Sequence, residues 1–303
     1  MKDILQTIES LATGRIGAAG KSPVKDLGFI SCANHVYIRH VPFYDPCLIL
    51  VLSGRKTIYD RRRPLVCDAG SILAVPAPAS FDIRNEPDRR GGAYRALVIP
   101  FDNELLERLA RAHDLHPSVQ RRDIGVLHFG RDEALLDSMR HYLASTGRGR
   151  LRTHRLMELL LLLAGQDARL LAYALNRDSW GQRVRAVLAT DLAYAWSLNE
   201  VCKRLATSES TLRRHLTKEK TSFRSLSHEL RLTTALMQLL QTSRPVYRIA
   251  YDCGYQSVSR FSSNFHKRFG LPPRELRDSV SESEQKLTVS GQPLPALPAI
   301  IAT

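Results

Sequence analysis

The stretch from residue 249 to residue 277 reads IAYDCGYQSVSRFSSNFHKRFGLPPRELR, and its two halves differ in pattern. A short apolar segment comes first, and a longer segment with regularly spaced phenylalanines follows. At about 100° per residue, four apolar side chains fall on one side of a helix: Val258, Phe261, Phe265 and Phe269. The opposite side carries Ser, Arg, Lys and Gln but no acid. Because a helix that faces only water usually mixes charges of both signs, this side indicates a charged partner.

The same arrangement occurs a second time, 49 residues earlier in the chain. SLNEVCKRLA predicts a short helix that begins at Ser197 or Asn199, and Ser208 is the N-cap of a second helix, ESTLRRHLTKE. Ser257 is the corresponding N-cap in the later copy. A short helix, a tight turn and a longer helix form the helix-turn-helix motif, whose second helix enters the major groove of DNA.

The outward side chains of the two second helices are the candidate DNA contacts. In the first motif Leu212 and Leu216 point inwards, as the phenylalanines do in the second. Arg is the commonest specific reader of guanine, and hydroxyl and amide groups suit phosphates and base edges. The candidates are Ser210, Arg213, Arg214 and Thr217 in the first motif and Gln256, Ser257, Ser259, Arg260, Ser263 and Lys267 in the second. FRSLSHELRLTTALMQLLQTS, between the motifs, predicts a helix of about 25 Å that can hold them about one DNA turn apart.

Residues 183–277 resemble the DNA-binding domain of the AraC/XylS family of transcription regulators. The resemblance rests on RLATSESTLRRHL, on ELRLTTALMQLL and on the stretch quoted first. It implies that the outward residues read bases and phosphates, that the chain is a homodimer, and that it activates transcription through RNA polymerase rather than repressing it. Two positions depart from the family pattern: Lys220 stands where the family usually has Gly, and Cys202 where it has a small Ala.

Charge is distributed unevenly along the 303 residues. The chain carries 44 Lys and Arg against 30 Asp and Glu, a formal net charge of +14. Residues 183–277 hold 17 of these bases but only seven of the acids, so this segment has +10 and the rest +4. The excess favours a polyanionic partner for the C-terminal segment, and double-stranded DNA is the expected one.

Residues 28–100 are predicted to be short strands, and the residues after Phe101 to be helices. The first segment is β-branched and aromatic with Gly, Pro and Asp breaks, typical of a small antiparallel barrel or sandwich, and Arg61, Arg62 and Arg63 are expected in a solvated turn. The family resemblance implies an α+β chain. By this resemblance, residues 1–177 are expected to form a cupin-like regulatory and dimerisation domain, with the barrel at about 26–101 and helices at about 102–177. Residues 183–277 are expected to bind DNA, and residues 278–303 to be a disordered tail.

One long apolar segment has more apolar surface than a peripheral helix needs. RLMELLLLLAGQDARLLAYALN has helical spacing, so part of its apolar surface is expected in the core and part against a second copy of the chain. The residues concerned are Leu156, Leu159, Leu160, Leu163, Leu170, Leu171 and Ala174.

An enzyme is the first alternative, because many cupins are metal-dependent enzymes. Such sites need clustered histidines and a carboxylate. His35 and His40 are five residues apart and are expected on opposite faces of a strand, and Ser80 stands where a late histidine commonly follows. The cysteines show no C-x-x-C pair, which favours neither a disulfide framework nor a zinc site: Cys32, Cys47, Cys67, Cys202 and Cys253. We therefore expect no catalytic residues, metal or cofactor. A DNA-repair fusion with a four-cysteine zinc site and a structural nucleoid protein are disfavoured too.

The barrel has three remaining interpretations: a sensor of a small effector, a platform for a regulatory protein, or no ligand. Five side chains are candidates for an effector pocket, although aromatic residues in small barrels are often just core: Tyr37, His40, Phe43, Tyr44 and Phe81. The beginning, MKDILQTIES, lacks the apolar region of a signal peptide, and LMELLLLLAG is shorter than the roughly 20 residues of a membrane-spanning helix. A cytoplasmic protein without membrane contact is expected.

Overall fold

The computed structural model describes residues 3–17, 27–60, 64–88, 92–115, 125–145, 149–175, 179–242 and 244–280. The described residues form two compact units: residues up to 175 together with 278–280 make the first, and residues 179–277 the second. The arginine turn expected at residues 61–63 lies outside the described residues, as does the expected disordered tail from residue 281 onwards.

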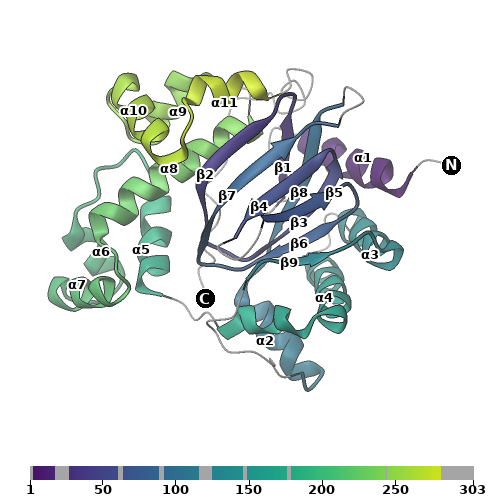
Figure 1. Ribbon diagram of the computed structural model, residues 1–303. Helices are drawn as coiled ribbons and strands as arrows, with labels where there is room; N and C mark the ends of the chain where they lie inside the picture. Colours follow the sequence, from purple (N-terminus) through teal and green to yellow (C-terminus); the bar gives the residue numbers. More distant parts are fainter. Residues whose placement is uncertain are drawn as a thin grey trace. The chain divides into compact units, whose positions relative to one another are not determined.

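Two antiparallel sheets form the centre of the first unit (Figure 1). One sheet has the order β1 (Gly28–Cys32), β8 (Tyr94–Pro100), β3 (Cys47–Ser53), β6 (Ile72–Val75) and β9 (Leu127–Phe129). The other has the order β2 (Val36–Phe43), β7 (Ala79–Glu86), β4 (Arg55–Tyr59) and β5 (Pro64–Asp68). The small antiparallel barrel or sandwich predicted from the strand pattern, and the cupin-like form implied by the family resemblance, are confirmed. β9 is an addition from the segment predicted to be helical, since three residues are too few for an alternating pattern to be recognised.

Helices cover the outer face of the five-stranded sheet. They are α1 (Ile4–Gly17), α2 (Asn103–Ala112), α3 (Glu133–Ala144), α4 (Gly149–Gln166) and the 3-10 helix η2 (Ala168–Leu175). Leu48, Leu50 and Leu97 of the sheet share one apolar core with these helices. The sequence pattern did not predict α1. No helix among the described residues is both long and apolar enough to span a bilayer.

The leucines of α4 and η2 belong almost entirely to this core. Six of them are at most 8% exposed: Leu156, Leu159, Leu160, Leu163, Leu170 and Leu171. Ala174 is partly buried against the same core. The large apolar side chain of α4 that remains exposed is Leu162, at 39%. Little of the predicted apolar stripe is therefore available to a second copy of the chain.

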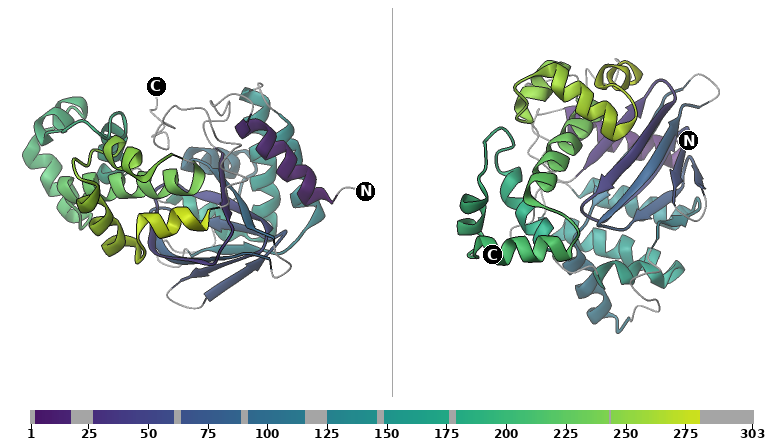
Figure 2. Two further views of the ribbon diagram at one scale, coloured as in Figure 1. Left: turned by 90° about the horizontal axis from the view of Figure 1, so that it is seen from above. Right: turned by 60° about the vertical axis from the view of Figure 1, so that its left-hand side comes forward.

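The second unit is all-helical in its described residues. Its helices are α5 (Trp180–Ala189), α6 (Leu198–Arg204), α7 (Glu209–Lys218), α8 (Phe223–Gln241), α9 (Val246–Asp252), α10 (Val258–Phe269) and α11 (Pro273–Ser279). The two views in Figure 2 show α8 running between the pair α6–α7 and the pair α9–α10. With 19 residues, α8 is about 28 Å long. It is buried on most sides, with Leu230, Leu236 and Leu239 among its buried residues.

Three serines begin the helices as the sequence predicted. Ser197 and Glu200 form a reciprocal capping box at α6, and hydrogen bonds from Ser197 and Tyr194 lower the pKa of the Glu200 carboxyl to about 2. The Ser208 and Ser257 hydroxyls accept hydrogen bonds from Thr211 N and Arg260 N at α7 and α10.

Lys220 ends the first motif in a left-handed conformation, with φ 56°. Lys220 N donates to Thr217 O at 2.9 Å and Thr221 N donates to Leu216 O at 3.0 Å, which are the two bonds of a Schellman motif. The chain therefore makes the turn in which the family uses Gly and tolerates a side chain there.

We predict that Lys220→Gly raises the free energy of unfolding by about 1 kcal/mol, because glycine adopts this conformation without a Cβ clash. Lys218→Gly is the matched control. Lys218 is the last residue of α7, so its replacement should lower stability by about 0.5–1 kcal/mol. Urea denaturation of both variants measures the effect, and a loss of stability in both would contradict a strained Lys220.

Candidate nucleic-acid interface

The second helix of each motif buries one side and exposes the other. In α7 Leu212 and Leu216 are 0% and 2% exposed. In α10 Phe261, Phe265 and Phe269 are each 0% exposed, and successive rings are in edge-on or tilted contact. Val258, predicted as part of this stripe, is only half-buried. Each helix is therefore anchored through one face, which leaves the other free for a partner.

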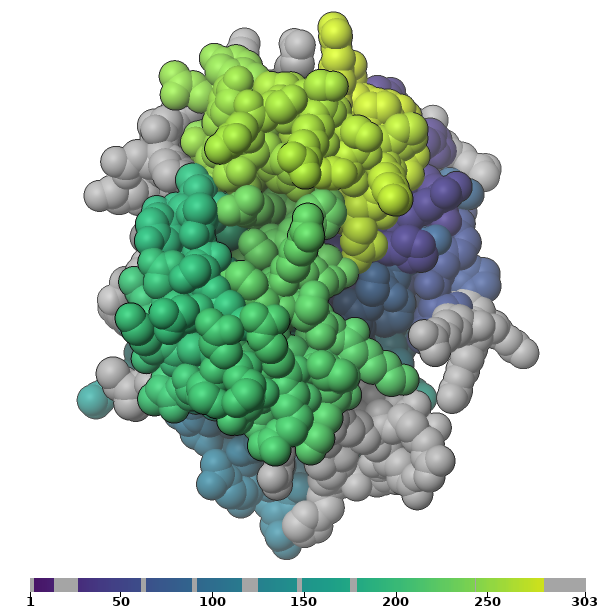
Figure 3. Space-filling model, turned by 90° about the vertical axis from the view of Figure 1, so that its left-hand side faces the viewer, coloured from purple at the N-terminus to yellow at the C-terminus, as the bar shows by residue number. Residues whose placement is uncertain are grey.

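All ten predicted DNA contacts lie on the exposed faces. These are Ser210, Arg213, Arg214 and Thr217 on α7 and Gln256, Ser257, Ser259, Arg260, Ser263 and Lys267 on or next to α10. Both helices reach the surface shown in Figure 3, α7 in green and α10 in yellow-green. Three hydroxyls already have internal bonds: Ser210 Oγ shares one with Ser208 Oγ at 3.1 Å, Thr217 donates to Arg213 O at 2.9 Å, and Ser257 caps α10.

The prediction that the outward faces carry no acid is wrong for α7. Glu209 is 46% exposed and accepts a hydrogen bond from Arg213 Nη2 at 3.2 Å. The helical wheel places Glu209 near the buried leucines, but it is the first residue of the helix, so no earlier turn covers it. The pair orients the Arg213 guanidinium and leaves its remaining N–H groups available.

Arginines from α8 and α11 hold the second motif in place. Arg231 donates to Gly254 O at 3.3 Å and to Tyr194 O at 3.2 Å, so it bridges the turn of this motif and the loop before the first. Gly254 has φ 79°, and a Cβ there would lie 2.6 Å from Leu192 O. Arg277 donates to the carbonyls of Leu239, Thr242 and Arg244 at the end of α8, and burial lowers its pKa to about 10.

α5 supports the first motif through contacts that sequence analysis missed. Glu219, directly after α7, accepts hydrogen bonds from Trp180 N at 2.7 Å and Gly181 N at 2.9 Å, the first amides of α5. The Trp180 ring stacks on His215 of α7, with centroids 4.7 Å apart. The partial positive charge at the N-terminus of α5 stabilises the Glu219 carboxylate. The residues are too far apart in sequence for any local signal to reveal the contact.

The five candidate ligand residues of the barrel do not converge. Tyr37, 39% exposed, and the exposed His40 bond to Asp82 on the outside of the four-stranded sheet. Phe81 is buried, and its ring centroid lies 6.0 Å from that of Phe43. Tyr44 is half-buried. A single pocket lined by all five is therefore excluded.

The expectation that His35 and His40 lie on opposite faces is wrong. The pairing of β2 with β7 shifts between Ile38 and Val41, and His40 has φ 49°. The extra residue of this bulge turns His40 outwards, where it approaches Asp82, while His35 approaches Glu86 on the same outer face. Among the described residues, no three His, Cys, Asp or Glu side chains are grouped as metal ligands.

Lys56 is a buried cation that sequence analysis did not select. It lies on β4, is 1% exposed, and donates to Asn85 Oδ1 at 2.9 Å inside the barrel. The strand RKTIY places Lys56 two residues before Ile58, so both side chains lie on the face of β4 that points inwards.

Two family descriptions match the chain. A helix-turn-helix domain family matches residues 201–279, which cover both motifs. The family described as the ExsA N-terminal regulatory domain matches residues 46–173, which cover most of the barrel and its helices.

Three curated relatives are transcription regulators by name. GadX of Escherichia coli is 31% identical over 134 residues, 44% of this chain and 49% of GadX. The urease operon transcriptional activator of Escherichia coli is 33% identical over 96 residues, 32% of either chain. YdeO of Shigella flexneri is 35% identical over 94 residues, 31% of this chain and 37% of YdeO. The chain thus spans half or less of these relatives.

Two solved structures share the fold of nearly the whole chain. An apo ToxT variant from Vibrio cholerae matches with a TM-score of 0.60 and 13% identity, covering 84% of this chain and 97% of that chain. Wild-type ToxT with a bound unsaturated fatty acid matches with a TM-score of 0.57 and 14% identity, covering 84% and 95%. These two likenesses concern the fold alone. The helix-turn-helix match, the regulatory-domain match and the three relatives make the chain similar to transcription regulators of the AraC/XylS family.

Proposed function

We propose that this chain is a sequence-specific DNA-binding regulator that reads two successive major grooves of a duplex. The observation that carries the proposal is that both recognition helices bury one apolar face and expose a face of Arg and hydroxyl side chains. The rigid helix α8 connects the two motifs within one compact unit. Exposed arginines in the first turns of a helix suit base edges in the major groove.

We further propose an activator that contacts RNA polymerase in the cytoplasm and has no catalytic role of its own. The support is the family and the name of one relative, the urease operon transcriptional activator. The first unit is proposed to sense a small effector. A ToxT structure with a bound fatty acid shows that this fold can hold a small molecule.

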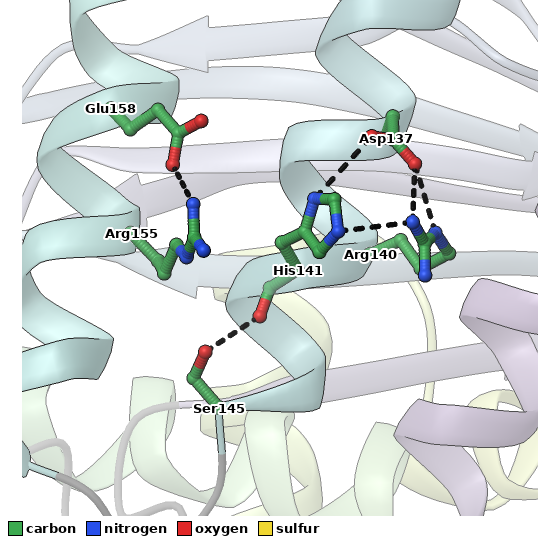
Figure 4. A network of polar contacts seen from close by, with 6 residues as sticks. All are labelled: Asp137, Arg140, His141, Ser145, Arg155 and Glu158. Atoms are coloured by element: carbon green, nitrogen blue, oxygen red, sulfur yellow. Dashed lines mark hydrogen bonds and ion pairs between the residues drawn. The ribbon is translucent and has the colours of Figure 1, made fainter.

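Homodimerisation is proposed through the outer face of α4. Leu162 is 39% exposed on this face, and Arg155 and Glu158, which pair at 2.7 Å, precede it by seven and four residues (Figure 4). On the neighbouring α3, Asp137 pairs with Arg140 and His141. Arg155 and Leu162 are seven residues apart and therefore lie on the same side of α4. An exposed apolar residue beside paired charges at this spacing is typical of a face that packs against a helix of a second copy.

The dimer proposal predicts that Leu162→Glu shifts full-length protein towards monomer, because the charge would be buried in the contact. Sedimentation equilibrium measures the dissociation constant, and Leu162→Ala should have a smaller effect. If Leu162→Glu had the same dimer dissociation constant as the wild type, α4 would not form the dimer contact.

Selection of bound duplexes from a random pool tests the DNA proposal. Full-length protein at physiological salt should enrich two short boxes centred about ten base pairs apart, since each recognition helix reads one groove. Salt-sensitive binding without any enriched sequence would contradict it and leave only electrostatic attraction.

Individual substitutions separate base readers from phosphate contacts. Arg213→Ala or Arg260→Ala should weaken binding of the enriched duplex by about 1–3 kcal/mol and relax the preference at one position. Lys267→Ala should weaken binding to all sequences alike and lower the slope of log K against log salt by about one. The control is Arg274→Ala, an exposed residue of α11 outside both faces. Titration at several salt concentrations measures all four, and equal effects of all four would contradict the assignment.

A further inference from the structure

The outer face of the four-stranded sheet exposes a row of aromatic, basic and apolar side chains. Tyr37 on β2, Arg84 on β7, Thr57 on β4 and Val66 on β5 are successive register partners, so the row crosses all four strands. Tyr37 is 39% exposed and Val66 is 47% exposed. The helices of the first unit pack on the other sheet, and Figure 1 shows none of them in front of these four strands. No described helix of the first unit therefore covers this face.

Two aromatic rings hold Arg84 in the middle of the face. Its Cζ lies 5.8 Å from the ring centroids of Tyr37 and of Tyr59, and the two rings meet edge to face with their centroids 5.8 Å apart. Arg84 is exposed, and no acceptor among the described residues bonds to its guanidinium. A guanidinium held by cation–π contacts loses little conformational freedom on binding, and its planar N–H groups match the two oxygens of a carboxylate. Arg84 is thus preorganised to bind a carboxylate.

The sheet does not supply this carboxylate itself. Its strands carry three acids on this face, and each already contacts a group on an adjacent strand or turn: Asp82 with Tyr37 and His40, Asp68 with Arg55, and Glu86 with His35. The same three acids repel a polyanion, because a nucleic acid would bring several phosphates to a face that holds three carboxylates. A protein segment with one carboxylate among apolar side chains meets the free guanidinium without that repulsion.

The exposed tyrosines and Val66 provide apolar contact area around Arg84. Tyr and Arg are enriched at protein interfaces, and they carry much of the binding energy there. Since neighbouring strands lie about 4.8 Å apart, the row from Tyr37 to Val66 is about 14 Å long. A short segment of a partner, roughly four residues when extended, therefore spans the row.

We propose that the outer face of the four-stranded sheet binds a segment of a partner protein. A carboxylate of this segment pairs with Arg84, and apolar side chains beside the carboxylate cover Tyr37 and Val66. The inference goes beyond the proposed reading of DNA, because it gives the first unit a protein partner and names the chemistry that the partner presents.

Selection of short random peptides displayed on phage tests this surface. The target is the full-length wild-type protein, and the library is first depleted on Arg84→Glu, which removes peptides that bind elsewhere. The enriched peptides should contain Asp or Glu next to apolar or aromatic residues, because the acid pairs with Arg84 and the apolar residues cover Tyr37 and Val66. Failure to enrich any peptide, or enrichment of peptides without an acid, would overturn the proposal.

Fluorescence anisotropy of a labelled synthetic peptide then measures the affinity for single variants. Arg84→Glu should weaken binding by at least about tenfold, and the milder Arg84→Gln by several-fold. Val66→Thr keeps the β-branched shape but adds a hydroxyl, so it should weaken binding by a smaller factor. Arg108→Glu is the matched control, since Arg108 is an exposed arginine of α2 and its reversal should leave the affinity unchanged. Equal losses in Arg84→Glu and Arg108→Glu would reduce the effect to net charge and overturn the site.

A charge exchange separates a lost contact from a distorted sheet. The selected peptide with its acid replaced by Arg should bind Arg84→Glu more tightly than it binds the wild type, because the ion pair is restored with the opposite polarity. A distorted sheet would bind neither peptide. Tighter binding of the exchanged peptide to the wild type than to Arg84→Glu would show that Arg84 does not pair with the acid.

The same variants test the two other occupants that this face could have. If it bound DNA, Arg84→Glu would weaken binding to a duplex, and if it bound a second copy, Arg84→Glu would raise the dimer dissociation constant in sedimentation equilibrium. We expect both quantities to stay at their wild-type values. A change in either one without a loss of peptide binding would overturn the proposal. Peptide binding that Arg84→Glu abolishes would support the surface even if the protein enriched no DNA sequence.

Discussion

Burial of one apolar stripe on each recognition helix is the constraint on which the second unit depends. α7 and α10 have ten and twelve residues, which is too short for a stable isolated helix in water. The phenylalanine stripe of α10 and the leucine pair of α7 supply the missing stability. Because those faces are buried, the opposite faces must be exposed, and the arrangement of the candidate DNA-contacting side chains follows from the packing of the core.

α8 connects the two helix-turn-helix motifs within one compact unit. It is buried along most of its length, and the ends of the neighbouring helices are tied to it and to α5 by Arg277, Arg231 and Glu219. These contacts use backbone carbonyls and amides, so they restrict the direction of each helix axis as well as its distance from α8. If the chain reads two grooves as proposed, a rigid connection fixes the spacing of the two boxes on DNA.

The first unit combines an ordinary apolar core with an unusual interior. Its helices and the outer face of the five-stranded sheet bury leucines in one continuous cluster. Between the sheets, by contrast, Lys56 is buried with neutral partners and without an acid. A hydrophobic side chain at this position would avoid the cost of burying an ammonium group.

Local signals in the sequence predicted most of the fold and the exposed faces of α7 and α10. The serine caps, the stripes of α7 and α10 and the strand pattern of the barrel depend on neighbours within a few residues, and the periodicity reveals them. The bulge at His40, the short strand β9, and the contact of Glu219 with α5 depend on partners distant in sequence, so no local pattern reveals them. The alternation in RKTIY places Lys56 on the inner face of β4, but the side chains that face it across the barrel come from distant segments of the chain.

Changing the spacing between the two enriched boxes tests the central claim most directly. Binding is measured on duplexes with five base pairs inserted between the boxes, about half a helical turn, and on the uninterrupted duplex at the same salt. If α8 holds both helices rigidly on one face of the DNA, the insertion should reduce affinity to that of a duplex with one box. Unchanged affinity after the insertion would contradict a rigid two-groove reader, because the motifs would then bind independently of each other.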